Sequence, residues 1–430
     1  MTGQLPAGPP FRAGIHYNKP MKILCSTYWY PEFNGDIHAT YVHDINRHLI
    51  LRKENTKVIV VTPNFGDSLS KEEMDGVVVE RFNCKVPMEF EYGKVAQMKK
   101  TVFTKIRGLF SMCRYILKNI LYTYLSAKKH NADIIHAHWA IPSGFSALVA
   151  AKLLRKPCFI TMHGGDVYYN EAEGYVFPKL WYVKPFLKYT LRNASMLTAI
   201  TVDCRRHAIN AGANTANVAV INNGADLRRF APINNGEVKE IKKQYGLEDK
   251  KVLFTCRQLI PRKGIRYLIK AMPYVLETHP NIKLLIAGDG MERSYLEQLI
   301  DMLDLNEIVI LLGWVKNNDL PKFYNASDIA VMPSLEEGFG IPAAEAMGCE
   351  LPVVSTDAGG LVEVVKNGIT GIIVPKANEK ALAEAVLKLL DDPELADKMG
   401  KAGRETAEKQ FSWDKTAEHL LMLFNNYVIP

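Results

Sequence analysis

The chain lacks the features that mark a secreted, disulfide-bonded or membrane-spanning protein. Its seven cysteines are scattered and include no Cys-x-x-Cys pair, which argues against a disulfide framework or a zinc site and favours a reducing cytosol. No run of about 18 apolar residues is present, so we expect no membrane-spanning helix. Residues 1–20 contain no apolar core segment, which excludes a standard signal peptide and predicts a disordered leader. We therefore expect a cytoplasmic protein.

The sequence also lacks a strong charge of either sign. The net charge of +7 is a moderate basic excess for 430 residues, and it suits an anionic small molecule or an anionic membrane surface. It gives no reason to expect nucleic-acid binding, which needs a clustered basic motif. Apolar residues make up 48% of the chain and charged residues 23%, as in a globular protein, and the length predicts two domains.

Short apolar runs alternate with longer amphipathic ones along the whole chain. In the first half, the apolar runs predict strands at 22–26, 57–61, 76–82, 133–137, 157–162, 195–200 and 217–221. In the second half, they predict strands at 251–256, 282–287, 307–312, 328–332, 352–355 and 371–374. Helical patterns lie between most of them, so the sequence predicts the α/β class, with two Rossmann-like, doubly wound parallel-sheet domains and a cleft between them.

A polar stretch separates the two halves. Residues 231–236 read Ala-Pro-Ile-Asn-Asn-Gly and precede a Lys/Glu-rich helical pattern, so a linker is expected over 231–248. The expected domains are 21–230 and 249–405, and a C-terminal helical segment over 406–430 can cross back to the first domain. Ligands of doubly wound sheets bind at the carboxyl ends of the strands, so the candidate site residues are sought there.

The segment 333–346, Pro-Ser-Leu-Glu-Glu-Gly-Phe-Gly-Ile-Pro-Ala-Ala-Glu-Ala, joins a strand to a helix through a glycine-flanked turn. Backbone N–H groups at the start of the helix favour an anion. The residues expected to supply them are Gly338, Phe339, Gly340 and Ile341. Two carboxylates, Glu337 and Glu345, bracket the turn; they suit sugar and ribose hydroxyls better than phosphate. The alternative is an ordinary turn with a solvated glutamate pair.

A second segment, 255–265, reads Thr-Cys-Arg-Gln-Leu-Ile-Pro-Arg-Lys-Gly-Ile and joins the end of a strand to a helix through a proline-containing loop. Arg257 and Lys263 lie on this loop. A guanidinium fork and an ammonium group suit the two phosphates of a diphosphate, and their charge would stabilise a leaving nucleoside diphosphate. The alternative is that such cations are solvated, which is our interpretation of Arg262.

Arg257 and Lys263, followed by the Glu337-x7-Glu345 element, resemble the retaining family 4 glycosyltransferases with the GT-B fold. Shorter motifs support the resemblance: Ile-Ala-Gly-Asp-Gly at 286–290, Phe-Tyr-Asn-Ala-Ser-Asp at 323–328 and Asn-Asn-Gly-Ala-Asp at 222–226. The resemblance covers nearly all of 21–425 and is strongest over 250–375.

The resemblance implies a role for each matched residue. Arg257 and Lys263 hold the donor diphosphate, Glu345 takes the ribose hydroxyls and Glu337 takes sugar hydroxyls. Residues 313–316 match the loop that meets the nucleobase, which makes Val315 a donor-binding residue. The family needs no metal, and no cofactor is expected besides the nucleotide-sugar donor.

The first half of the chain supplies the remaining matches. His163, in the Thr-Met-His-Gly-Gly-Asp motif of 161–166, matches the family histidine that faces the transferred sugar; a packed or capping histidine is the alternative. The loop 30–36 usually carries two adjacent glycines near the donor phosphates or the acceptor. Here Gly35 remains as a donor-binding residue, and Asp36 either caps the next helix or contacts the acceptor. The expected catalytic residues are His163, Arg257, Lys263 and Glu337.

His136 and His138 are alternate residues of a predicted strand, so both imidazoles point to one face of the sheet. A metal site is one interpretation, but no carboxylate or thiol partner stands near them in the sequence. A structural role or a role on the acceptor side is therefore preferred. The chain also has no Asp-x-Asp cluster at a strand end that could bridge a divalent ion and a diphosphate, so a metal-independent enzyme is expected.

Residues 94–130 form a long helical pattern without any acidic residue. Its cations are Lys94, Lys99, Lys100, Lys105, Arg107, Arg114, Lys118, Lys128 and Lys129. A basic amphipathic helix is typical of a membrane-surface element, which predicts a peripheral protein at the inner face of a membrane and a lipid-linked acceptor. The alternative is that the apolar side of the helix packs on the first domain, and both interpretations can hold together.

The expected activity is the transfer of a sugar from a nucleoside-diphosphate sugar to an acceptor hydroxyl, on a lipid or a glycan, with retention of configuration. No side chain stands out as a covalent nucleophile. One rival is a hydrolysing nucleotide-sugar epimerase of the same fold, which would yield an altered free sugar in place of a new glycoside. The other is a non-catalytic sugar-nucleotide-binding subunit, which would show no turnover.

Overall fold

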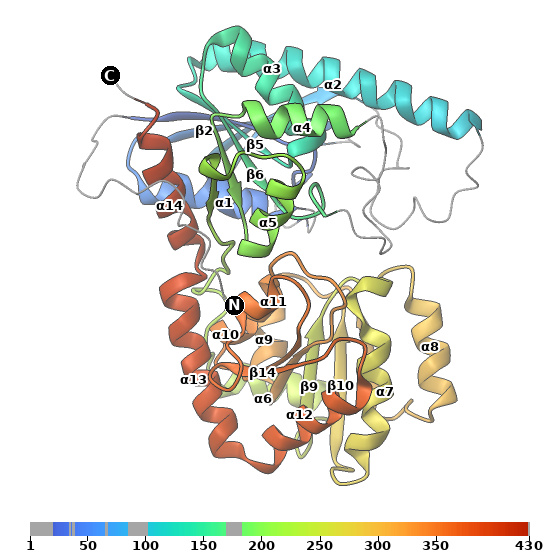
Figure 1. Ribbon diagram of the computed structural model, residues 1–430. Helices are drawn as coiled ribbons and strands as arrows, with labels where there is room; N and C mark the ends of the chain where they lie inside the picture. The colour runs from blue at the N-terminus through green and yellow to red at the C-terminus, as the bar shows by residue number, and fades with distance from the viewer. Residues whose placement is uncertain are drawn as a thin grey trace. The chain divides into compact units, whose positions relative to one another are not determined.

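The chain divides into two compact units, seen in the computed structural model of Figure 1: unit 1 comprises Met1–Asn222 and Trp413–Pro430, and unit 2 comprises Asn223–Ser412. The structure describes residues 20–33, 36, 39–64, 68–84, 102–168 and 183–428, except for the side chains of 102–109 and 235. The sequence analysis placed the boundary at 231–248. In the structure that stretch contains helix α6 (Asn235–Gln244), which packs on α9 (Leu320–Asn325) inside unit 2.

Unit 1 is built on an eight-stranded sheet in the order β3-β4-β2-β1-β5-β6-β7-β8. The strands are β1 Lys22–Ser26, β2 Lys57–Asn64, β3 Lys71–Met74, β4 Val77–Asn83, β5 Ile134–His138, β6 Cys158–Met162, β7 Met196–Ala199 and β8 Val218–Val220. Strands β5 and β6 are buried along their whole length, as expected of parallel strands that are covered on both faces. Every pairing is parallel except that of β3 with β4, which is antiparallel.

Helices cover this sheet: α1 Thr40–Arg52, α2 Val102–His130, α3 Phe145–Leu154, α4 Lys184–Asn193, α5 Val202–Asn210 and α14 Trp413–Asn425. Helix α2 packs on α3, α3 packs on α4, and α1 packs on α14. The last helix belongs to unit 1 because its apolar face is buried there; Phe424, for example, lies 4.7 Å from Phe159 of β6 between ring centroids.

Unit 2 is a six-stranded, all-parallel sheet in the order β11-β10-β9-β12-β13-β14. The strands are β9 Lys251–Cys256, β10 Ile282–Ala287, β11 Val309–Gly313, β12 Ile329–Met332, β13 Val353–Thr356 and β14 Gly371–Val374. The remaining helices are α7 Ile265–Leu276, α8 Arg293–Met302, α10 Ile341–Gly348, α11 Leu361–Val364, α12 Glu379–Asp391 and α13 Pro393–Gln410. Helices α7 and α12 pack together over the sheet and bury Leu268, Met272 and Val386 in its core.

The predicted fold class, with two doubly wound α/β domains, is confirmed. The sequence analysis did not predict β3, whose residues Lys71-Glu72-Glu73-Met74 bury only the methionine, and its expectation of purely parallel sheets is wrong at this edge. Among the described residues, no helix has the length and apolar character needed to cross a membrane.

Candidate active site

The candidate site lies where four neighbouring parallel strands of unit 2 end, in the order β10-β9-β12-β13. Backbone hydrogen bonds join the loops that follow them. The N–H of Leu259 donates to the carbonyl of Asp289 at 2.9 Å, and the N–H of Leu335 donates to that of Arg262 at 2.8 Å. The N–H of Gly360 donates to the carbonyl of Glu337 at 2.9 Å. These bonds fix the loops against one another and set the directions of their side chains.

Two glycines make this close packing possible. Gly264 has a φ of +66°, and a Cβ atom there would lie 2.0 Å from the carbonyl oxygen of Pro333. Gly288 has a φ of +129°, and a Cβ atom would lie 1.9 Å from the carbonyl oxygen of Arg257. Any larger residue at either position must therefore move the loop that carries Arg257 and Lys263.

The predicted cations Arg257 and Lys263 meet the predicted carboxylate of Glu337. Arg257 Nη1 donates to Glu337 Oε2 at 2.6 Å, and Lys263 Nζ donates to Oε1 at 2.9 Å and to Oε2 at 2.8 Å. Ser334 Oγ donates a further bond to Oε2 at 3.2 Å. The side chains are 2%, 12% and 10% exposed for Arg257, Lys263 and Glu337, so this ion cluster is largely shielded from water.

Burial and charge act in opposite directions on this cluster. Burial lowers the pKa of Lys263 to about 8, and the negative charge of Glu337 offsets only part of that effect. Burial alone would raise the pKa of Glu337, but the charges of Lys263 and Arg257 outweigh it and hold that pKa at about 2. All three groups are charged at neutral pH, so two positive charges and one negative charge leave a net positive charge.

Several hydrogen-bond donors beside this cluster have no partner among the described residues. Arg257 uses only Nη1; its Nε and Nη2 are buried and bond to no described residue. Within the described part of the chain, the backbone N–H groups of Phe339, Gly340 and Ile341 also donate no hydrogen bond. They lie at the start of α10, where Gly340 takes a left-handed φ of +99°. Buried, unpaired donors and a helix N-terminus together favour an anionic ligand.

Glu345, the second predicted carboxylate, is half-buried on α10. Tyr324 donates its hydroxyl to Glu345 Oε2 at 3.0 Å, and this partner was not predicted although Tyr324 lies in the 323–328 motif. Burial raises the pKa of Glu345, whereas Arg229 and the Tyr324 hydrogen bond act to lower it. Both carboxylates of the element therefore lie in unit 2, each held by partners from other loops or helices.

The loop predicted to meet the nucleobase follows β11. Gly288 N–H donates to the carbonyl of Gly313 at 2.7 Å, which ties this loop to the one that supports Arg257. Val315 is half-buried there, and the neighbouring Trp314 side chain is 51% exposed. The predicted donor-binding residues of 313–316 thus adjoin the same strand ends as the ion cluster.

His163 lies after β6 in unit 1, within a cluster of three histidines. His138 Nδ1 and His163 Nε2 share a hydrogen bond of 2.9 Å, and the two rings stack. His136 Nε2 bonds Thr161 Oγ1 at 2.7 Å. The buried His163 Nδ1 bonds to no described residue, so it is the nitrogen of this ring that a ligand can use.

Burial lowers the pKa of His136 and of His163 to about 3 and keeps that of His138 well below its usual range. The imidazoles are therefore neutral at neutral pH. Beside them, burial raises the pKa of Asp166 to about 6, against hydrogen bonds from backbone N–H groups such as that of Ala140 at 2.6 Å. A neutral, partly satisfied cluster can orient hydroxyl groups but supplies no fixed charge.

The predicted convergence of His136 and His138 is confirmed, because their ring centroids lie 4.5 Å apart. Each bonds to a side chain of the chain itself, as the structural interpretation expects. No group of three or more His, Cys, Asp or Glu side chains in the described residues is arranged to hold a metal ion.

The loop after β1 is described only in part. Gly35, a predicted donor-binding residue, lies outside the described residues. Asp36 is buried and accepts a hydrogen bond from the N–H of Glu32 at 2.8 Å, so it caps its own loop. Helix α1 begins at Thr40 without a side-chain cap, and the expectation that Asp36 caps this helix is wrong.

Comparison with known proteins matches both units. The family described as Glycosyltransferase Family 4 matches residues 38–229, and the family described as Glycosyl transferases group 1 matches residues 237–406. The uncharacterized glycosyltransferase MJ1178 of Methanocaldococcus jannaschii is 28% identical over 398 residues, which span 92% of this chain and 95% of that protein.

A second relative has a named activity. The GDP-mannose-dependent monoacylated alpha-(1-6)-phosphatidylinositol monomannoside mannosyltransferase of Corynebacterium glutamicum is 36% identical over 187 residues, which span 42% of this chain and 48% of that protein. Among solved structures, Anabaena HepE in complex with UDP superimposes with a TM-score of 0.73 at 21% identity, covering 94% of this chain and 100% of that one. The likeness to HepE shows the fold.

Proposed function

The chain belongs to the family 4 glycosyltransferases with the GT-B fold, and from this premise we propose that it transfers a sugar from a nucleoside-diphosphate sugar to an acceptor hydroxyl with retention of configuration. Its place in the family makes it a glycosyltransferase. The donor, the stereochemical course and the acceptor are our proposals. The observation that carries them is the ion cluster of Arg257, Lys263 and Glu337, with its unpaired donors, at the strand ends of unit 2.

The donor diphosphate binds to the cations and to the start of α10. Arg257 Nε and Nη2 donate to phosphate oxygens, Lys263 supplies an ammonium charge, and the N–H groups of 339–341 complete the set. These groups are fixed by the loop contacts before the ligand arrives, so little reorganisation accompanies binding. HepE, which shares the fold, is described in complex with UDP, and a nucleoside diphosphate is the ligand that this arrangement suits.

The two carboxylates accept hydroxyl groups of the donor. Glu345 takes the ribose, because Tyr324 holds one of its oxygens and orients the other. Glu337 takes the transferred sugar, and Val315 meets the nucleobase. His163, whose Nδ1 bonds to no described residue, is proposed to face the transferred sugar on the strength of the family resemblance alone.

Retention is proposed from the family resemblance, and no side chain is assigned as a covalent nucleophile. The departing diphosphate accepts the proton of the attacking hydroxyl on the same face of the sugar. Arg257 and Lys263 stabilise the negative charge that develops on the leaving group, so catalysis rests on positioning and electrostatics. A hydrolysing epimerase would release an altered free sugar in place of a new glycoside, so the product distinguishes the two activities.

A thermal-shift screen over nucleoside diphosphates and their sugars identifies the donor. A true donor stabilises the protein by about 2.7 kcal/mol at a hundredfold excess over its Kd. Proton NMR of the glycoside product then reports the configuration of its anomeric carbon. A product of inverted configuration, or a free sugar with no new glycoside, would overturn the proposal.

We also propose that the acceptor is met at an anionic membrane, through the exposed sides of α2, α3 and α4. Helix α2 buries mainly polar side chains and exposes apolar ones. Tyr115, Asn119 and Thr123 are fully buried, whereas Phe110 and Leu117 are 73% and 68% exposed. Both interpretations of this helix therefore hold in part: Tyr115 packs inward on unit 1, whereas Phe110 and Leu117 face outward. The first eight residues of the predicted 94–130 helix, 94–101, lie outside the described residues.

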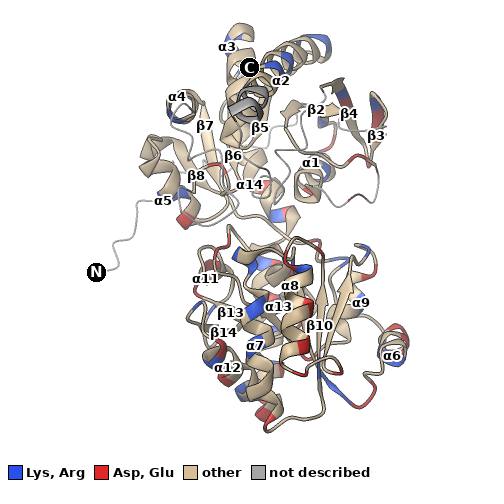
Figure 2. Ribbon diagram, turned by 90° about the vertical axis from the view of Figure 1, so that its right-hand side faces the viewer, with Lys and Arg blue, Asp and Glu red and all other residues tan. Residues whose placement is uncertain are grey.

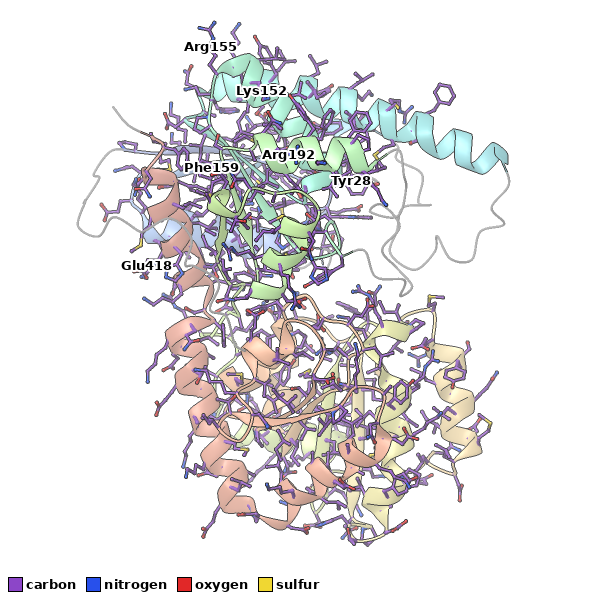
Figure 3. The ribbon with its side chains drawn as sticks, in the orientation of Figure 1. Tyr28, Lys152, Arg155, Phe159, Arg192 and Glu418 are labelled. Carbon is purple, nitrogen blue, oxygen red and sulfur yellow. The ribbon has the colours of Figure 1, made fainter. Side chains whose placement is uncertain are left out.

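Charge points to the same partner. No acidic residue occurs in α2, α3 or α4, and Figure 2 shows Lys and Arg on these helices without Asp or Glu. Exposed cations lie beside the apolar side chains: Arg114, Lys128, Lys152, Arg155, Lys188 and Arg192. Figure 3 labels three of them on this side of unit 1. Each cation near an anionic leaflet contributes roughly 1 kcal/mol, so several together give reversible binding.

Co-sedimentation with vesicles of phosphatidylglycerol and phosphatidylcholine tests this membrane-binding surface. Binding should fall with added salt and fall again in Arg114→Gln/Lys128→Gln/Arg155→Gln. The matched variant Lys239→Gln/Lys243→Gln/Lys398→Gln removes three exposed cations of unit 2 and should bind as the unmodified protein does. An equal loss of vesicle binding in both variants would show that binding depends only on the net charge of the protein. If the unmodified protein does not bind the vesicles at low salt, a soluble acceptor is favoured.

A further inference from the structure

The carboxylate of Glu337 is placed on the cations that the donor diphosphate needs. Both of its oxygens accept hydrogen bonds from Lys263, and one also accepts from Arg257. Its neighbour Glu336 differs: the Glu336 carboxylate makes no ion pair with any described residue. The position of Glu337 is also fixed by the backbone, because its carbonyl accepts the N–H of Gly360.

The Glu337 carboxylate occupies the same hydrogen-bond donors of Arg257 and Lys263 that a bound anion would use. Two buried cations left alone would repel each other and would lose their hydration without compensation. Glu337 supplies that compensation and completes the site in the absence of a ligand. The same contacts mean that a phosphate group reaching Arg257 Nη1 or Lys263 Nζ must compete with a carboxylate already bonded there.

We infer that Glu337 is a built-in counter-ion that competes with the terminal phosphate of the product for Arg257 and Lys263, and so makes the site hold the donor in preference to the free nucleoside diphosphate. This inference rests on the proposed function. While the sugar is attached, its hydroxyls donate to Glu337 and draw the carboxylate away from the cations. Once the sugar has left, the carboxylate returns to the cations and weakens the hold on the product.

Glu337→Gln tests the inference, because glutamine keeps the size and the acceptor oxygen but removes the charge. Binding of inorganic pyrophosphate, measured by isothermal titration calorimetry, should become at least tenfold tighter. Pyrophosphate contains neither base nor sugar, so it reports the competition alone. Glu336→Gln is the matched control and should leave the affinity unchanged. An unchanged or weaker affinity in Glu337→Gln, in a protein that melts cooperatively, would overturn the inference.

Glu337→Asp keeps the result decisive if the glutamine variant does not fold. Its charge is retained, but the side chain is one methylene shorter and cannot reach both cations, so pyrophosphate should bind more tightly than to the unmodified protein. In kinetics with the donor found by the screen, either variant should raise KM for the donor and lower the inhibition constant of the product. A purely structural role would move both constants in the same direction.

Failure of the inference about Glu337 can be distinguished from failure of the proposed function. If Arg257→Ala and Lys263→Ala bind pyrophosphate as the unmodified protein does, the diphosphate site itself is wrong. If those variants lose binding while Glu337→Gln does not gain it, only the competition is wrong.

Discussion

Replacing Arg257 by alanine should separate ligand binding from folding. The side chain is 2% exposed, and two of its three guanidinium nitrogens bond to no described residue. Two hydrogen bonds from this cation to phosphate oxygens, each worth about 1.5–3 kcal/mol, amount to at least about 3 kcal/mol. At about 1.4 kcal/mol per tenfold change, the affinity for nucleoside diphosphate should fall by about a hundredfold or more.

The folded state should survive this change. Glu337 keeps its bonds to Lys263 in Arg257→Ala, so no buried charge is left without a partner. Calorimetric titration with nucleoside diphosphates and with pyrophosphate gives the affinity, and urea denaturation gives the free energy of unfolding.

Lys398→Ala, which removes an exposed cation of α13 in the same unit, is the control and should bind normally. Unchanged affinity in both Arg257→Ala and Lys263→Ala would refute the reasoning. So would loss of binding that merely follows loss of folding, reported by a free energy of unfolding near zero.

Three further predictions address the metal, the loop packing and the histidines. Turnover should persist in excess EDTA if, as proposed, Arg257 and Lys263 stabilise the leaving group in place of a divalent ion; loss of turnover that magnesium or manganese restores would contradict this. Gly288→Ala should lower the free energy of unfolding by about 2–4 kcal/mol and weaken pyrophosphate binding. Gly246→Ala is the control, because Gly246 has a φ of +62° with open space around it, and it should lower the free energy of unfolding by only about 1 kcal/mol. Urea denaturation measures both values. The pKa of His136 and of His163 is about 3 in the folded protein, below the value of 6.5 in the unfolded chain, so protons bind preferentially to the unfolded chain. The two histidines therefore contribute their full stabilisation above pH 6.5. Between pH 6.5 and pH 3, the free energy of unfolding should fall by roughly 1 kcal/mol per pH unit for each histidine. Melting temperatures between pH 4.5 and 7.5 should show a flatter dependence in His163→Gln, and an unchanged slope would remove this histidine from the explanation.

Local patterns predicted most of the fold. Strands β9, β10 and β14 begin and end at the predicted residues, because buried parallel strands are apolar without interruption. Strand β3 was missed because an edge strand of Lys-Glu-Glu-Met carries no apolar pattern, and its pairing depends on the tight turn at Gly76. The division between the units was displaced because residues 231–248 are polar in sequence yet anchored by Asn325, which bonds the backbone at 231 and 233.

The site was predicted as a set of residues but not as a set of contacts. Arg257 and Glu337 are 80 positions apart, and only the order of the strands brings them together. The sequence analysis assigned them separate ligands, diphosphate and sugar, and gave no reason to expect an ion pair between them. Tyr324 was missed for a similar reason: a buried aromatic residue on a short helix carries no sign of its hydroxyl's partner until α10 is placed against it.

The return of the chain into unit 1 constrains the order in which the protein can fold during synthesis. Helix α14 follows unit 2 in the chain, and it bonds to parts of unit 1 that are made 194 and 372 residues earlier: Thr416 Oγ1 donates to the carbonyl of Asn222 at 2.8 Å, and Lys53 Nζ donates to Asn425 Oδ1 at 3.1 Å. Unit 2 emerges from the ribosome complete, between the two parts of unit 1. The N-terminal unit, which usually folds first, must therefore wait with an apolar face uncovered, and chaperone demand should peak in that interval.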